Sequence, residues 1–185
     1  MIVGKSLQEE GELMLEKNDQ FSYFTLEKDK ALLERAVAIS WSSKEHGNTP
    51  FGALLVDEQG NILMEQENIE ITEKDCTGHA ETTLIRRASK AYDKSFLARC
   101  SLYSTAEPCV MCAGALYWSG IGRLVYAISE KKLLMLTGDN EQNPTLDVPC
   151  RTVFEHGQKD VLVVGPIEDE ALENMVVAPH IGYWD

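Results

Sequence analysis

Two short segments of the sequence carry side chains that could bind a metal ion. The first is His79-Ala80-Glu81, and the second is Pro108-Cys109-Val110-Met111-Cys112. Together they offer one imidazole and two thiols. Zinc held by three protein ligands keeps a fourth position for water, whereas structural zinc sites use four protein ligands. His79, Cys109 and Cys112 therefore predict one catalytic Zn²⁺ ion per chain.

A carboxylate accompanies the predicted ligands. Glu81 lies two positions after His79, and a carboxylate beside a metal site can transfer protons. Two thiolates and a neutral imidazole would offset the charge of the ion, so a nearby base would assist the attack of water. We therefore expect Glu81 to be the catalytic residue and not a ligand.

A closed structural zinc site is the alternative. Cys76 and His79 have C-x-x-H spacing, so Cys76 could be a fourth ligand in a non-catalytic zinc-binding domain. That arrangement leaves Glu81 and Pro108 without a role. The open, catalytic site is the better interpretation.

The surroundings of these segments resemble the zinc motifs of the cytidine-deaminase-like superfamily, which combine H-x-E with P-C-x-x-C. The similarity runs through residues 75–81 and 103–115. It is strongest to the purine branch, which holds bacterial guanine deaminases and tRNA adenosine deaminases. The resemblance implies a zinc-dependent hydrolase that deaminates a small free nucleobase or nucleoside, guanine-like, and releases ammonia. A tRNA adenosine deaminase is the alternative.

The resemblance also implies substrate contacts. Pro50-Phe51-Gly52-Ala53 and Asn68 are similar to the substrate-pocket segment of the same branch, and Ala80 is expected at the substrate as well. The Asn68 amide could pair with a donor and an acceptor on a base edge, or it could only form an Asx turn. Phe51 and Trp118 could stack on a planar base or fill the core.

The C-terminal tail resembles that of guanine deaminases, which closes the active site of a partner subunit. Tyr183 and Trp184 are therefore expected to help close a zinc pocket in a homodimer, although both rings could instead pack on their own chain. The insertion at residues 137–146 is unfamiliar for the family. Within it, Asp139 is a further candidate for a second proton-handling group.

Composition and charge narrow the range of partners. The chain has 185 residues, 44% of them hydrophobic, and a net charge of −13. Nucleic-acid binding depends largely on Lys and Arg at phosphates, so this charge disfavours RNA and favours a small-molecule substrate. No apolar run approaches the roughly 18 residues of a membrane span. Five cysteines, two of them in the metal motif, indicate a reducing compartment, and we expect a cytoplasmic protein.

Apolar periodicity predicts alternating strands and helices after an N-terminal extension at residues 1–27, which could hold a helix over residues 7–15. The deaminase domain is expected to span residues 28–185, as an α/β protein with a three-layer α/β/α sandwich and a mixed central sheet. Thr77 is expected to cap the helix that follows it. Strands are predicted at 51–56, 62–64, 102–105, 124–128 and 161–164, and helices at 33–47, 80–92, 109–118, 151–156 and 168–175.

Overall fold

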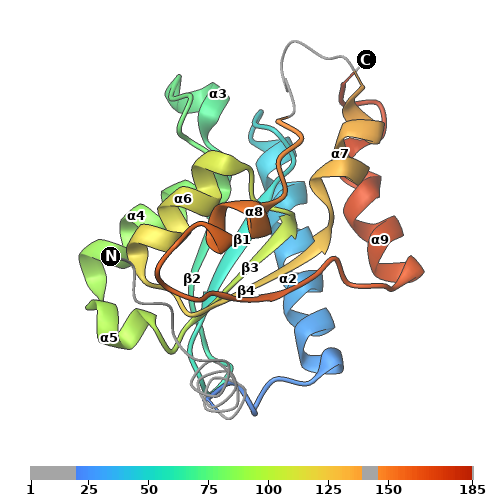
Figure 1. The fold of residues 1–185 in the computed structure, drawn as a ribbon. Helices are drawn as coiled ribbons and strands as arrows, with labels where there is room; N and C mark the ends of the chain where they lie inside the picture. The colour runs from blue at the N-terminus through green and yellow to red at the C-terminus, as the bar shows by residue number, and fades with distance from the viewer. Residues whose placement is uncertain (1–19, 139–145, 185) are drawn as a thin grey trace.

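A five-stranded mixed sheet forms the centre of the computed structural model, which describes residues 20–138 and 146–184 (Figure 1). The strand order is β2-β1-β3-β4-β5. Strand β1 runs antiparallel to both β2 and β3, whereas β3, β4 and β5 are parallel. The strands are β1 (Gly52–Val56), β2 (Ile62–Glu67), β3 (Ser101–Ala106), β4 (Arg123–Ile128) and β5 (Leu162–Val164).

Helices cover both faces of the sheet, as Figure 1 shows. Successive side chains of a strand point to opposite faces, so Leu54 belongs to one core cluster and Leu55 to the other. The first cluster is covered by α2 (Leu26–Glu45), α7 (Glu130–Thr137) and α9 (Glu170–Val177). The second is covered by α4 (Ala80–Ala91), α5 (Lys94–Leu97), α6 (Val110–Ser119) and α8 (Cys150–Glu155). The predicted α/β/α sandwich with a mixed sheet is confirmed.

A buried ion pair fixes α2 on the sheet. Arg123 Nη2 lies 2.6 Å from Asp29 Oδ2, and the Tyr103 hydroxyl donates to Asp29 Oδ1 at 2.6 Å. Both carboxylate oxygens of Asp29 accept hydrogen bonds, and such bonds help a buried charge pair to be tolerated. Helix α2 is thereby set in place, and its C-terminal end leads into the loop that precedes β1.

Several predictions about individual elements need correction. Thr77 does not cap α4: its backbone N–H and its hydroxyl bond to Asp75 Oδ1, and His79 occupies the cap position. A short helix, α3 (Glu70–Glu73), separates β2 from α4, so only the second zinc motif follows a strand closely. Helix α7 was not predicted.

Side chains from the expected N-terminal extension also contribute to the core. Phe21, placed in the extension, is buried, and Phe24 packs against the first core cluster. The core therefore includes side chains that precede residue 28. The predicted helix at residues 7–15 lies outside the described residues. After α9 the chain ends in the 3₁₀-helix η1 (Ala178–His180) and the tail. Within the part of the chain that the structure describes, no helix is long and apolar enough to cross a membrane.

Candidate active site and metal centre

The three predicted metal ligands meet at the N-terminal ends of two helices. His79 is the cap residue of α4, Cys109 is the cap residue of α6, and Cys112 lies in the first turn of α6. His79 Nδ1 is 3.6 Å from the Sγ atom of each cysteine. Ligand atoms around tetrahedral zinc, at N and S distances near 2.0 and 2.3 Å, lie about 3.5 Å apart. The donor set therefore fits zinc.

Cys76 does not join this group. Among the described residues, the only cluster of metal-binding side chains whose ligand atoms converge consists of His79, Cys109 and Cys112. Cys76 is exposed and lies at the pocket near them. The site thus has three protein ligands, and the closed four-ligand alternative is not supported.

Neighbouring side chains hold the ligands in place. The Thr82 hydroxyl, in the first turn of α4, donates to Cys112 Sγ at 3.2 Å and so links the two helices. On the other side of the imidazole, Nε2 lies 3.9 Å from Glu70 Oε2, which is within ion-pair range but too long for a hydrogen bond. Ligating histidines are commonly oriented by such a carboxylate. No spacing in the sequence indicated Glu70.

The ligand side chains share protons when no metal is bound. Hydrogen bonding to Cys109 raises the pKa of His79 to about 9, despite the opposing effect of burial. The pKa of Cys109 falls to about 4, first because Cys112 donates a hydrogen bond to it and further because His79 does. Cys109 is thus already a thiolate beside a protonated imidazole, and zinc would take the place of the shared protons.

Glu81 faces the same site from the first turn of α4. Its side chain is buried, its Oε1 accepts a hydrogen bond from the Ser104 hydroxyl at 2.7 Å, and its Oε2 lies 3.5 Å from Cys112 Sγ. Burial raises the pKa of Glu81, while His79 and the Ser104 bond act in the opposite direction. A carboxylate with a raised pKa is a better proton acceptor. The position suits proton transfer beside a metal.

A cavity of about 300 Å³ opens onto the ligands and Glu81. This volume is at the lower end of the range for small-molecule sites. Four glutamates line the cavity, Glu70, Glu81, Glu107 and Glu130, and no lysine or arginine among the described residues does. The site is therefore small and strongly acidic.

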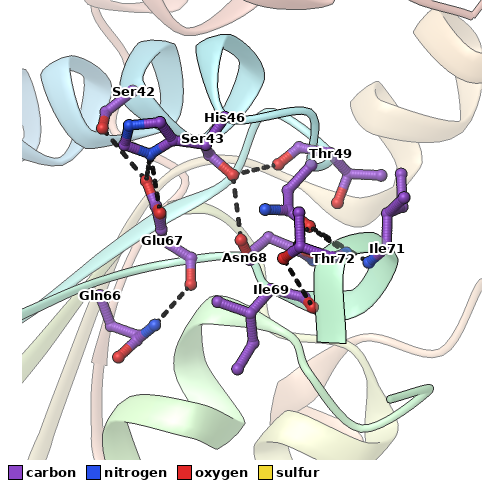
Figure 2. A network of polar contacts seen from close by, with 11 residues as sticks. Ser42, Ser43, His46, Thr49, Gln66, Glu67, Asn68, Ile69, Ile71 and Thr72 are labelled. Carbon is purple, nitrogen blue, oxygen red and sulfur yellow. Dashed lines mark hydrogen bonds and ion pairs between the residues drawn. The ribbon is translucent and has the colours of Figure 1, made fainter. Parts of the chain in front are cut away.

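Asn68 and Phe51, the expected substrate contacts, line this cavity. Asn68 Oδ1 accepts the backbone N–H of Glu70 at 2.8 Å, so the amide forms a turn and its Nδ2 makes no bond with the described residues. The structure is therefore compatible with both roles considered for Asn68, the turn and a contact with the substrate. Figure 2 shows how the segment is held: the Ser43 hydroxyl contacts the carbonyls of Thr49 and Asn68 at 2.7 and 3.3 Å.

Other predicted substrate contacts do not reach the cavity. Trp118 is 71% exposed on α6, so it is neither a core residue nor a wall of the pocket in its own chain. Ala80 is fully buried, and its side chain does not line the cavity. Asp139 lies outside the described residues.

The aromatic tail packs on its own chain, next to the cavity. Trp184 Nε1 lies 3.3 Å from His180 Nδ1, and the buried His180 ring packs edge-on against Phe51 with 5.2 Å between ring centroids. Tyr183 lies near Lys44. Neither Tyr183 nor Trp184 lines the cavity directly. Their connection to the site runs through His180 and Phe51.

Sequence reasoning missed two buried glutamates at the site. Glu107 accepts the backbone N–H groups of Glu130 at 3.1 Å and Cys150 at 2.9 Å, and so joins the starts of α7 and α8. Its place beside Pro108 was the one signal available. Glu130 is 5% exposed, and nothing in the local sequence marks it.

The segment that contains the metal ligands is similar to known deaminases. Residues 26–128 match the cytidine and deoxycytidylate deaminase zinc-binding region. A probable cytosine deaminase of Schizosaccharomyces pombe is 38% identical over 160 residues, which is 86% of this chain and 94% of that protein. A tRNA-specific adenosine deaminase of Haemophilus influenzae is 36% identical over 133 residues, or 69% and 77% of the two chains. The solved guanine deaminase of Bacillus subtilis shares 38% identity with a TM-score of 0.51, over 56% of this chain and 66% of that one.

Proposed function

We infer that this chain, which belongs to the cytidine and deoxycytidylate deaminase zinc-binding family, removes the exocyclic amine of a small free nucleobase. Membership confirms the superfamily that the motifs resembled. Guanine is the substrate that the sequence motifs favoured. Cytosine stands beside it because the S. pombe relative spans most of both chains. The single observation that carries the proposal is the buried Glu81 beside three converging ligands in a small cavity.

The chain's own residues would divide the work of the reaction. His79, Cys109 and Cys112 would hold the zinc, which when bound supplies a Lewis acid that activates water. Glu81, held by Ser104, would accept a proton from the attacking water and return it to the ring or to the leaving amine. Asn68 Nδ2 is available to orient the base, and Phe51 to cover one of its faces.

The charge of the cavity supports an uncharged substrate. Among the described residues that line the cavity, a phosphate group would approach four glutamates and no lysine or arginine. Nucleoside phosphates are therefore expected to bind worse than the corresponding bases or nucleosides.

A tRNA adenosine deaminase is the second candidate, favoured by the similarity to the H. influenzae protein. The net charge of −13 opposes it, since RNA binding draws on cationic side chains. Salt-dependent binding to tRNA, or formation of inosine in tRNA by the purified protein, would favour this candidate over the first.

The test is ammonia release from cytosine, guanine, their nucleosides and an aminotriazine. We expect turnover that is lost with a zinc chelator and restored by zinc. Glu81→Gln should lose about 10²- to 10⁴-fold in kcat while it retains zinc, because Glu81 is not a ligand. Near-normal turnover by this variant, or no ammonia from any member of the panel, would contradict the proposal.

A further inference from the structure

Glu130 is a buried carboxyl group at the cavity that the reaction described above does not use. It is the first residue of α7, 5% exposed, and lines the cavity together with Glu81 and Cys109. Its backbone N–H is held by Glu107 Oε2 at 3.1 Å, which sets the start of the helix. Its own carboxyl group makes no hydrogen bond or ion pair with any described residue.

The side chain of Glu130 is largely buried, but its carboxyl oxygens are open to the cavity and have no partner among the described residues. A carboxyl group that serves only the fold would be bonded, as Glu107 is through two backbone N–H groups. Glu130 instead faces the cavity that the metal ligands and Glu81 also line. Its missing partner is therefore expected to arrive with the ligand.

We propose that Glu130 is a substrate-recognition residue, whose carboxyl group accepts a hydrogen bond from an amino or ring N–H group of the bound base. The inference rests on the proposed function and specifies which groups on the edge of the base the pocket recognises. Asn68 Nδ2 is free to donate from the segment after β2, and Glu130 is free to accept from the segment after β4. A nucleobase presents both kinds of group on its edges, so the two side chains together would fix one orientation.

The electrostatics of the cavity agree with this role. Burial, together with the negative charges of Cys109, Glu81 and Glu107, raises the pKa of Glu130 to about 8. A hydrogen-bond donor on the bound base would favour the ionised, accepting form of Glu130 and would oppose this rise in pKa.

The experiment compares base binding with Glu130 intact and replaced, in zinc-loaded Glu81→Gln protein so that the bases are not consumed. Glu130→Leu removes all hydrogen bonding, and Glu130→Gln keeps the shape but adds a donor. Glu170→Gln is the matched control, because Glu170 is also the first residue of a helix but is exposed and does not line the cavity. Cytosine, guanine, adenine and pyrimidin-2-one are the probes, with zinc content and melting temperature measured for each variant.

We expect Glu130→Leu to weaken binding of the preferred base by at least about tenfold, and Glu130→Gln to change the ranking of the four probes. Zinc content should not change, and Glu170→Gln should match its parent. Should Glu130→Leu not fold, the altered ranking in Glu130→Gln decides the matter. Equal affinities and an unchanged ranking in the Glu130 variants, or no binding of any base to the parent, would overturn the inference.

The two proposals can fail separately. If the wild-type chain binds bases through Glu130 but releases no ammonia, the proposed function is wrong and this inference stands. If ammonia is released and kcat/KM is unchanged in Glu130→Leu and Glu130→Gln, the proposed function stands and the inference about Glu130 is wrong.

Discussion

The protons held by the three ligands determine how zinc binding responds to pH. At pH 7 a His79 pKa of about 9 means a protonated imidazole, and a Cys109 pKa of about 4 means a thiolate. Hydrogen bonding to Cys109 and burial raise the pKa of Cys112, which stays a thiol. Zinc requires a neutral imidazole and two thiolates. We therefore predict that zinc binding at pH 7 releases about two protons, one each from His79 and Cys112.

Titration calorimetry in buffers of different ionisation enthalpy counts these protons. Zinc affinity should fall as the pH is lowered from 9, because each step down restores protons that zinc must displace. A release near zero, or an affinity independent of pH between 6 and 9, would show that the ligands are not protonated as described.

Ser104 is expected to set the pH range in which Glu81 works. Burial raises the pKa of Glu81, and the hydrogen bond from Ser104 partly offsets that rise. Ser104→Ala should therefore move the pKa of Glu81 further up. Because the ionised form is the proton acceptor, the acidic limb of the kcat profile should shift to higher pH, with kcat at neutral pH reduced about tenfold and zinc retained.

Ser101→Ala is the matched control, since Ser101 lies on the same strand and its buried hydroxyl has no hydrogen-bond partner among the described residues. This variant should keep the pH profile of the wild type. If both serine variants shift the acidic limb equally, the effect does not come from the bond to Glu81.

At the scale of elements, the approach of α2 to β1 depends on Gly52. A Cβ atom at this position would lie 2.9 Å from Ile39 Cβ and still closer to the Ala36 carbonyl oxygen. Gly52→Ala should therefore force the helix away from the strand and lower the free energy of unfolding by about 1–3 kcal/mol. Because Phe51 adjoins this contact and lines the cavity, KM should rise as well.

Gly114→Ala provides the comparison, because a Cβ atom at this position inside α6 would come within 4 Å of no described residue beyond its own stretch of helix. Removing a helical glycine should raise stability by about 0.5–1 kcal/mol. Chemical denaturation of both variants measures the two effects. A Gly52→Ala protein as stable as the wild type would mean that α2 and β1 are less closely packed than described.

At the scale of the whole molecule, the role of the C-terminal tail depends on whether the chain forms the predicted homodimer. The contacts of Tyr183 and Trp184 with their own chain predict that the tail acts on its own pocket, through His180 and Phe51. Deleting residues 182–185 should therefore reduce turnover by a larger factor than it reduces stability. Trp118→Ala, which alters an exposed ring away from the cavity, should leave turnover unchanged.

Mixing the truncated chain with full-length Glu81→Gln protein separates the two arrangements. If each tail serves its own chain, the mixture should stay as inactive as its parts. Recovered activity would show that a tail closes the pocket of a partner subunit, as the resemblance to guanine deaminases implied. Light scattering on the wild-type chain tests the homodimer itself.

Local spacing was sufficient to identify the metal centre and the strands. His79 and Glu81 lie at the start of one helix, and Cys109 and Cys112 lie at the start of another, so their relative positions follow from helix geometry within each segment. The buried strands β1 and β4 were visible as short, continuous apolar runs. Both kinds of signal extend over a few residues only.

Only the tertiary structure brought Glu107 and Glu130 to the cavity and placed Trp118 outside it. Glu130 is 23 residues from Glu107 in sequence, and the two meet because β3 and β4 are parallel neighbours whose ends share one edge of the sheet. Strand order and the choice of which helix face is covered depend on packing between distant segments, which no local pattern encodes. For the same reason an aromatic residue such as Trp118 gave no indication of whether its side of α6 would be covered.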